Sequence, residues 1–213
     1  MIKFTSQKLV TTLALTACLG GALSACAPII VGGAVVGSLM ATDRRTTGTQ
    51  VEDEGIELRA ASRIRENLGE RVHVNVTSYN RQLLLTGEVP TAQDKQLVEQ
   101  VVSKVENVRS IVNELDVLGK SSLTQRSSDV LVTGRVKAGF VDAKDLFANA
   151  FKVVTERGTV YLMGRVTQRE ANRATEIARG TTSVLKVVRL LEIISEEELQ
   201  GMMPRPAPSE SKK

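Results

Sequence analysis

Apolar residues occur at every second position in two short stretches near the middle of the chain. Val74 and Val76 are apolar in the first stretch, Leu83 and Leu85 in the second, and the bend residues 79–82 lie between them. Alternation with a period of two is typical of a strand with one buried face, and a short polar bend between two such strands is typical of a hairpin. The pattern therefore predicts two antiparallel strands.

The same pattern occurs again 77 positions later. The strand positions of this second copy are Phe151, Val153, Val160 and Leu162. After Pro90, which has no counterpart, the offset becomes 76 and the match continues. The positions of the first copy that match there are Thr91, Asp94, Val101, Val108, Ile111, Val112, Leu115 and Val117. We interpret this as an internal duplication, and because two copies are too few for a solenoid, each copy is read as a small domain.

Each copy also has two helical patterns. Thr91 with Asp94, and Thr167 with Glu170, have the spacing of a helix N-cap, and apolar residues at helical spacing follow them. An earlier helix opens each copy. In the first copy we expect its inward face to consist of Leu58, Ala61, Ile64 and Leu68.

The expected order of elements in each copy is α-β-β-α-β. The second and third strands are joined through a helix, so they should be parallel with a right-handed crossover. The predicted fold class is α+β, with two tandem αββαβ two-layer domains at residues 56–118 and 128–195, each a three-stranded mixed sheet packed on two helices. Domains of this size are marginal alone, so we expect the two copies to pack against each other.

The N-terminus has the pattern of an exported protein. Lys3 and Lys8 precede a mostly apolar run at residues 9–23, and small residues follow it. This order is typical of a secretory signal that is later removed, and we assign residues 1–25 to a signal peptide.

Residues 23–26 read Leu-Ser-Ala-Cys and resemble the lipobox of bacterial lipoproteins. In those proteins the cysteine carries a diacylglycerol and, after cleavage, an N-acyl chain. The resemblance implies that Cys26 is lipidated; the alternative is an ordinary cleaved signal with an incidental cysteine. A similar motif ends at Cys18, but cleavage there would leave an apolar core too short for export.

Residues 26–55 are assigned to the lipidated N-terminus and a tether. The apolar run at residues 27–41 is too short to cross a bilayer, and it lies either in the headgroup region or against the folded part. Residues 42–55 are polar and predict a tether, in which we interpret the acidic residues 52–54 as solvated. Residues 196–213 end in a proline-containing segment and are expected to be a disordered tail.

Charge and composition argue against several classes of function. The net charge is +4, or +2 after removal of the two lysines of the signal, and aromatic residues make up 3% of the chain, which is too little for a base-stacking platform. His73 is the only histidine, and no cysteine follows Cys26, so neither a second imidazole nor a thiolate accompanies it for a metal site. We interpret His73 as a surface or strand-edge residue. We expect no enzyme activity, no nucleic acid, no metal and no cofactor other than the lipid on Cys26.

Residues 153–167 and 83–89 carry a family resemblance. Both segments are similar to the BON domain, which is named for bacterial osmotically induced proteins and nodulation. Its marks here are a glycine at the end of the second strand, a capped helix, and Val-x-x-Val-Val before the last strand. The resemblance covers about residues 55–195. A lipobox with two BON domains resembles outer-membrane lipoproteins linked to envelope integrity and to anionic phospholipid, and Ala27 after the cysteine resembles their sorting signal. The resemblance implies a lipoprotein on the periplasmic side of the outer membrane of a Gram-negative bacterium.

In that family the membrane is contacted chiefly by the first helix of the second domain. The resemblance points to Leu131, Arg135, Val136, Lys137 and Phe140 as the lipid-binding candidates.

The residues themselves are compatible with that role. Gly134 and Gly139 each cost a helix about 1 kcal/mol relative to alanine, and a weak local preference that a site still requires can mark function. Apolar side chains beside cations also suit an interface with anionic headgroups. The alternative is that Val132, Val136 and Phe140, at positions i, i+4 and i+8, are core residues.

We therefore expect a non-enzymatic outer-membrane lipoprotein that supports envelope integrity and whose second domain contacts anionic phospholipid. The alternative is a periplasmic adaptor that recruits an envelope assembly or secretion factor. Its distinguishing feature would be an exposed strand edge, such as residues 184–194, open to pairing with a partner.

Overall fold

The computed structural model describes residues 43–202. The predicted signal peptide, Cys26 and the apolar run 27–41 lie outside the described residues. The elements of the first repeat are α3 (Thr47–Leu68), the 3-10 helix η2 (Gly69–Arg71), β1 (His73–Tyr79), β2 (Gln82–Val89), α4 (Ala92–Val102), β3 (Ser110–Asn113) and β4 (Asp116–Val117). Those of the second repeat are α5 (Leu123–Asp142), η3 (Ala148–Ala150), β5 (Phe151–Glu156), β6 (Thr159–Thr167), α6 (Gln168–Gly180) and β7 (Lys186–Ile194), followed by α7 (Glu196–Met202).

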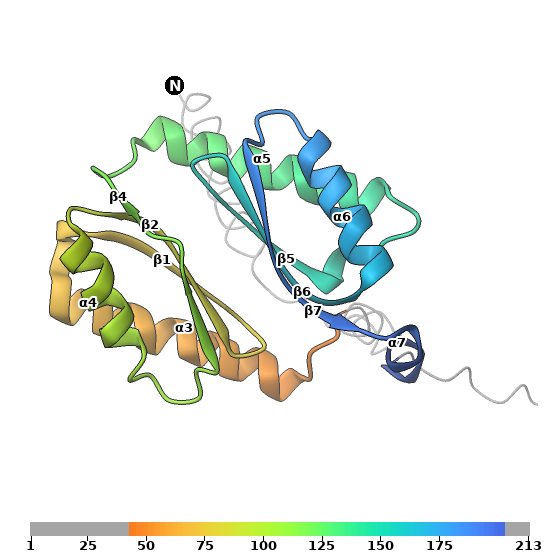
Figure 1. Cartoon of the computed structure of the whole chain (residues 1–213), viewed down its shortest axis with the longest axis horizontal. Coiled ribbons are helices and arrows are strands. Elements are labelled where there is room, and N and C mark those ends of the chain that lie inside the picture. The colour runs from red at the N-terminus through yellow and green to blue at the C-terminus, as the bar shows by residue number, and fades with distance from the viewer. Residues whose placement is uncertain (1–42, 203–213) are drawn as a thin grey trace, which may run out of the picture. The chain divides into compact units, whose positions relative to one another are not determined.

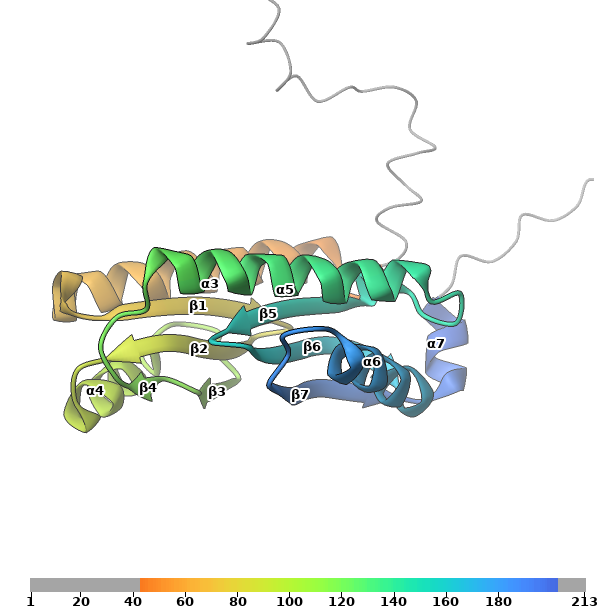
Figure 2. The same ribbon diagram turned by 90° about the horizontal axis from the view of Figure 1, so that it is seen from above.

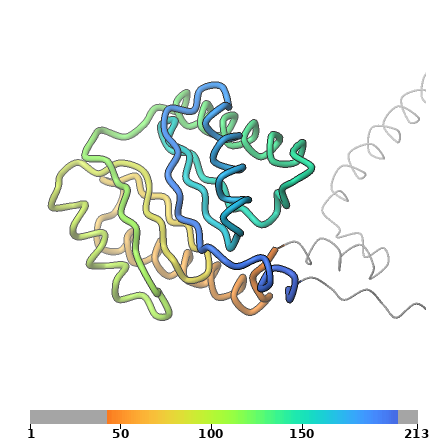
Figure 3. The backbone as a smooth tube through the Cα atoms, turned by 45° about the vertical axis from the view of Figure 1, so that its right-hand side comes forward, coloured from red at the N-terminus to blue at the C-terminus, as the bar shows by residue number. Residues whose placement is uncertain are grey.

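The predicted α+β class and its strand directions are confirmed. In repeat 1, β1 pairs with β2 antiparallel, and β2 pairs with β3 and β4 parallel. In repeat 2, β5 pairs with β6 antiparallel, and β6 pairs with β7 parallel over nine residues. Figure 1 shows the two helices of each repeat on the outer side of its own sheet. The chain passes from β4 into α5 without any strand being shared between the two sheets (Figure 3).

The prediction that residues 42–55 form a polar tether is wrong from residue 43 onward, where the chain is part of the folded structure. Helix α3 begins at Thr47, where the Thr46 hydroxyl accepts a hydrogen bond from the amide of Thr49. Before the helix, Arg44 donates to both carboxylate oxygens of Glu170 at 2.7 Å, and Arg45 donates to Asp53 at 2.8 Å. The polarity of this segment reflects pairing with buried carboxylates. At the other end, residues 196–202 form α7 with Leu199 buried, so the expected disordered tail does not begin at residue 196.

The residues of α3 that face the core are only partly those expected, because two of the four expected positions point elsewhere. Leu58 is 73% exposed and Ala61 is half-buried, so neither is a core anchor. The buried apolar positions of the helix are Ile56, Ala60, Ile64 and Leu68. They follow one another at i+4, which keeps them on one face, whereas Leu58 lies on the opposite side. The first domain was expected to begin at residue 56, but α3 begins nine residues earlier, at Thr47. Ile56 therefore lies inside the helix, where it belongs to the core.

Alternate residues of the central strands face two different cores. On β2, Leu83 and Leu85 pack under α3 and α4, while Leu84 points to the other side of the sheet. On β6, Leu162 belongs to the core under α5 and α6, while Tyr161 points away from it. The side chains on these inner faces meet in one cluster formed by Tyr79, Leu84, Tyr161 and Met163. The two sheets therefore pack against each other, as expected from the small size of each repeat, and the first helices α3 and α5 both run along their hairpins (Figure 2).

A buried aspartate at the same place in each repeat fixes the hairpin. Asp53 of α3 accepts from the amides of Asn80 and Arg81 at 2.8 Å. Asp129 of α5, 76 positions later, accepts from the amides of Arg157 and Gly158 at 2.9 Å. The interpretation of residues 52–54 as a solvated acidic run is therefore wrong for Asp53, which is almost fully buried.

Candidate membrane-contact site

Helix α5 carries all five candidate residues, and the structure divides them into two groups. Val136 and Phe140 are 0% and 1% exposed, and the Phe140 ring lies 5.1 Å from that of Phe151. These two candidates are core residues and cannot contact lipid. The alternative prediction, that Val132, Val136 and Phe140 form a core face at i, i+4 and i+8, is confirmed for them. Leu131, Arg135 and Lys137 are exposed.

The exposed side of α5 is more apolar than expected. Val130, Leu131 and Val141 are 70%, 60% and 71% exposed, and the small residues Gly134 and Ala138 lie between them. Since successive residues of an α-helix turn by about 100°, these five positions share one side of the helix, opposite the buried side. We call Val130, Leu131, Gly134, Arg135, Lys137, Ala138 and Val141 the α5 outer face. Val130 and Val141 were missed from the sequence, although they occupy the side opposite Val132, Val136 and Phe140.

The charges on the α5 outer face are all positive. Lys137 lies at one margin of the apolar residues and Arg135 at the other, and neither has an ion-pair partner within residues 43–202. The acid nearest the middle of the helix, Asp129, is buried and bound to the hairpin of repeat 2. Asp142, the last residue of α5, is exposed next to Val141 and is the acidic residue that borders this surface. The surface thus combines exposed aliphatic groups with two unpaired cations.

The two glycines of α5 have different surroundings. A Cβ at Gly134 would meet nothing within 4 Å, so this glycine is open to solvent on the α5 outer face. A Cβ at Gly139 would lie 2.8 Å from the side chain of Ile177 in α6. Close packing of α5 on α6 therefore requires Gly139. Gly134 adds no side chain to the α5 outer face.

A second group of polar residues joins the repeats. Glu88 is fully buried at the end of β2, and its carboxylate accepts from the Ser121 amide at 3.1 Å and from Arg157 at 3.1 Å. The ring Nδ1 of His73 lies 2.9 Å from the same carboxylate. Burial raises the pKa of Glu88, but the His73, Ser121 and Arg157 contacts outweigh it and hold that pKa below its usual value.

His73, Glu88 and Glu156 place potential metal-ligand atoms within 4.8 Å of one another. Burial raises the pKa of Glu156, whereas the pKa of Glu88 is lowered by its hydrogen-bond donors. Both Glu88 oxygens already accept hydrogen bonds from protein donors, Arg157 on one oxygen and the Ser121 amide on the other. The arrangement fits an inter-repeat junction better than a metal centre. His73 is mostly covered, which corrects its reading as a surface residue, although it does begin the edge strand β1.

No helix within residues 43–202 combines the length and the apolar character needed to span a bilayer. Cys26, the predicted lipidation site, lies outside these residues.

Comparison with known proteins gives the family. The model of the BON domain matches residues 53–119 and 128–195. The chain is 37% identical over 175 residues to "Outer membrane lipoprotein DolP" of Haemophilus influenzae, covering 81% of this chain and 90% of that protein. It is 32% identical over 154 residues to "21 kDa hemolysin" of Actinobacillus pleuropneumoniae, covering 71% and 79%.

Among solved structures, the C-terminal domain of CdsD, a type III secretion protein of Chlamydia trachomatis, aligns with 65% of this chain and 96% of its own at 12% identity. Its TM-score of 0.28 is too low to support an argument. The similarity to DolP supports the expected localisation, which is the outer membrane of a Gram-negative bacterium. With two matched domains and this relative over most of its length, the chain belongs to the BON domain family, as a dual BON-domain lipoprotein of the DolP kind.

Proposed function

We propose that this protein is a non-enzymatic outer-membrane lipoprotein that supports envelope integrity by contacting anionic phospholipid through α5. The observation that carries the proposal is the α5 outer face, where Val130, Leu131 and Val141 are exposed between the unpaired cations Arg135 and Lys137. The two relatives described above are named as a lipoprotein and a hemolysin, and neither name is that of an enzyme.

The physical chemistry of this surface suits a membrane interface. Exposed aliphatic groups on a surface helix enter the boundary between headgroups and acyl chains, where their burial is favourable. Each cation near an anionic membrane contributes about 1 kcal/mol. Two cations and three aliphatic side chains give weak binding alone, so the contact depends on an anchor that holds the domain near the lipid.

That anchor is proposed to be a lipid on Cys26, a diacylglycerol thioether with an additional N-acyl chain. Several acyl chains on one cysteine hold a protein far more firmly than a single chain does. Mass spectrometry of the N-terminal peptide of the purified protein tests this part of the proposal. A triacylated peptide that begins at Cys26 is expected, and an unmodified peptide would contradict it.

Co-sedimentation with vesicles tests the lipid contact. The mature chain with Cys26→Ser carries no lipid, so any binding comes from the protein. We expect binding to phosphatidylglycerol vesicles that weakens with salt, and a loss of about fivefold for each of Arg135→Gln and Lys137→Gln, since one cation near the surface contributes about 1 kcal/mol. Leu131→Ser should weaken binding as well.

Arg179→Gln is the matched control, because Arg179 is an exposed arginine of α6 away from the α5 outer face. Residues 27–41 are present in every variant, so their own affinity for lipid cancels in the comparison. Equal binding of the α5 variants and the control would disprove the role of this surface.

The adaptor function is the second candidate, and one observation favours it. Strand β7 is nine residues long and pairs only with β6 among residues 43–202, so its other edge is open. A groove of about 210 Å³ adjoins this strand, lined by Gln168, Ala171, Arg189, Leu191 and Ile193. An extended peptide could add to this edge as a fourth strand.

Complementation in a strain that lacks the protein separates the two functions. If lipid contact supports the envelope, Arg135→Gln with Lys137→Gln should fail to restore resistance to detergent while Ile193→Asp restores it. The reverse result would favour the adaptor.

A further inference from the structure

Two buried carboxylates from different repeats face each other where the repeats meet. Glu88 of β2 is 1% exposed, and Glu156, the last residue of β5, is 6% exposed. One ligand atom of each, together with a ring nitrogen of His73, lie within 4.8 Å of one another. We call Glu88, Glu156 and His73 the junction triad. Two carboxylates buried this close to each other are unfavourable when both are ionised.

The two carboxylates of the junction triad have unequal partners. Glu88 is held by the Ser121 amide and by Arg157, and this arginine crosses from repeat 2 to repeat 1. Glu156 accepts from the side-chain amide of Asn75 at 2.8 Å, also across the interface. None of the salt bridges among residues 43–202 involves Glu156. A single guanidinium therefore serves two carboxylates, and a proton on Glu156 removes the repulsion between them.

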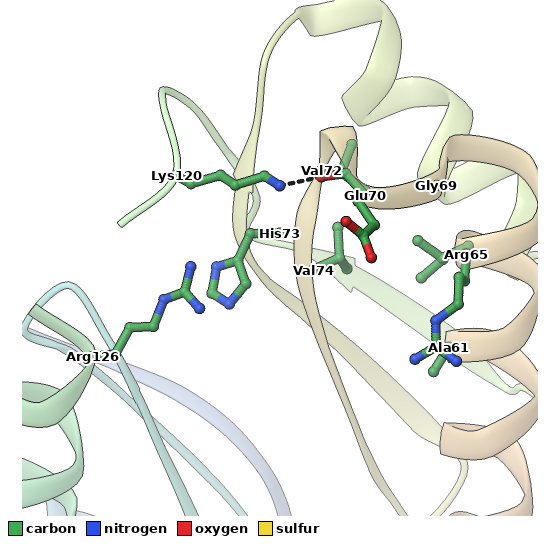
Figure 4. Close-up of a pocket in the computed structure, with 10 residues that line it drawn as sticks. Ala61, Arg65, Gly69, Glu70, Val72, His73, Val74, Lys120 and Arg126 are labelled. Atoms are coloured by element: carbon green, nitrogen blue, oxygen red, sulfur yellow. Dashed lines mark hydrogen bonds between the residues drawn. The ribbon is translucent and has the colours of Figure 1, made fainter. Parts of the chain in front are cut away.

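The other charged and titratable groups nearby do not offset the charge of Glu156. Asp129 of α5 faces it and adds a further negative charge. Burial raises the pKa of Tyr161 of β6, so its hydroxyl stays neutral. Figure 4 shows the Arg126 guanidinium of α5 next to the ring of His73, and the Arg126 Nε donates to a serine hydroxyl at 3.1 Å. Glu156 thus lacks a cation of its own.

This environment makes the ionisation of Glu156 depend on folding. Burial is the largest cause of its raised pKa; the Asn75 hydrogen bond opposes burial, and the charges of Glu88 and Asp129 add to it. Because the folded pKa is raised, the folded state holds the proton more tightly than the unfolded state. The stability that Glu156 contributes is therefore present below its unfolded pKa and is lost as the pH rises through the folded value.

We propose that the junction triad is a pH-dependent latch between the repeats, closed while Glu156 holds a proton and loosened when that proton is lost. A proton on His73 acts in the same direction, because an imidazolium pairs with Glu88 2.9 Å away. The latch adjoins the start of α5, since the Ser121 amide bound by Glu88 comes two residues before this helix. The inference goes beyond the proposed function, because the junction triad lies off the α5 outer face.

The chain contains its own probes for the opening of this interface. Tyr79 and Tyr161 are its two tyrosines, and it has no tryptophan. Both rings belong to the buried layer between the two sheets, where they are 4% and 5% exposed. Acrylamide in solution reaches these rings only when the layer opens. Quenching of tyrosine fluorescence therefore reports separation of the repeats.

The test uses the full mature chain with Cys26→Ser between pH 5 and pH 8. Quenching should rise in one step as the pH increases, and the carbon-13 signal of the Glu156 carboxyl should titrate with the same midpoint. Glu156→Gln keeps an oxygen that accepts from Asn75 and stands for the protonated form, so it should abolish the step and stay weakly quenched throughout. Glu106→Gln, at an exposed position of repeat 1, is the matched control and should keep the step.

Unfolding in urea adds a quantitative condition. Between the two pH values the unfolding constant of the wild type, relative to Glu156→Gln, should rise about tenfold for each unit by which the folded midpoint exceeds the unfolded one. A Glu156 carboxyl that titrates at or below its ordinary value of 4.5 would overturn the proposal. This measurement needs only the wild type, so it decides even if Glu156→Gln fails to fold.

Two further results would also overturn the latch. One is equal quenching of the wild type at pH 5 and pH 8, and the other is a step that survives Glu156→Gln. His73→Gln should keep the step, because Glu156 carries the proton. Loss of the step in His73→Gln alone would assign that proton to the imidazole and overturn the assignment to Glu156.

Discussion

At the scale of single residues, the buried carboxylates carry more of the structure than the sequence indicates. Asp53 accepts from Arg45, from the Ser78 hydroxyl and from the amides of Asn80 and Arg81. Burial raises the pKa of Asp53, but these donors favour the charged form more strongly and lower the pKa below its ordinary value. The carboxylate is thus a fixed, ionised part of the hairpin.

Asp53→Asn should lower the free energy of unfolding by about 2–4 kcal/mol, since an amide cannot accept from all of these donors. Because the folded pKa is lowered, the carboxylate contributes stability above its unfolded pKa, and this contribution is lost as the pH falls through the folded value. The wild type should therefore lose stability below about pH 4, and the variant should lose less there. Urea unfolding between pH 7 and pH 3 measures both effects.

Asp129→Asn is the matched change in repeat 2 and should cost a similar amount. A pH dependence of stability that Asp53→Asn leaves unaltered would show that Asp53 is not the ionised hairpin cap described above.

Sequence reasoning could have found these aspartates but not the burial of individual α5 residues. Asp53 and Asp129 match at the same offset of 76 as the residues after Pro90, and this match is their signal in the sequence. For Val136 and Phe140, helical spacing shows that they share a face but not whether that face meets the core or a membrane. Only the packing of Phe140 on Phe151 decides it.

At the scale of elements, the two glycines that weaken the helix preference of α5 differ in what their neighbours require. Gly139 is required where α5 packs on Ile177, and Gly134 is not required by any neighbour. The structure of the polar residues just before α3 could not be predicted from periodicity, because Arg44 pairs with Glu170 of repeat 2 and Arg45 pairs with the buried Asp53.

Gly134→Ala should raise the free energy of unfolding by about 1 kcal/mol, since alanine is the better helix former and its methyl group meets open space. Gly139→Ala should fall short of that gain or destabilise, because its Cβ would lie 2.8 Å from Ile177. Thermal unfolding of the two variants side by side is the measurement. An equal gain in both would mean that α5 and α6 are not this closely packed.

At the scale of the whole molecule, the two sheets share one buried layer. Its signal in the sequence is the continuous apolar run in each second strand, such as Leu83 to Leu85, because a strand buried on both faces loses its alternation. The duplication and the order of elements were predictable from periodicity. The pairing of the two inner faces depends on residues of both repeats, so no single copy reveals it.

Met163→Asp places a carboxylate in the layer between the sheets, where Met163 is fully buried. The cost should exceed about 4 kcal/mol, because an unpaired buried charge is among the most destabilising changes known. Leu58→Asp, at a position 73% exposed, should change stability by less than about 0.5 kcal/mol. Urea unfolding compares them, and a tolerated Met163→Asp would show that the sheets separate in solution.

The ion pair between Arg44 and Glu170 makes the duplicated halves unequal. The corresponding carboxylate of repeat 1, Asp94, is bound by Arg71 from within its own repeat. Glu170 depends on an arginine that precedes repeat 1 and lies outside both matched domains. The ancestral modules have therefore lost their interchangeability: a protein with the halves in reverse order, or the second half produced by itself, would leave Glu170 without the guanidinium that neutralises it.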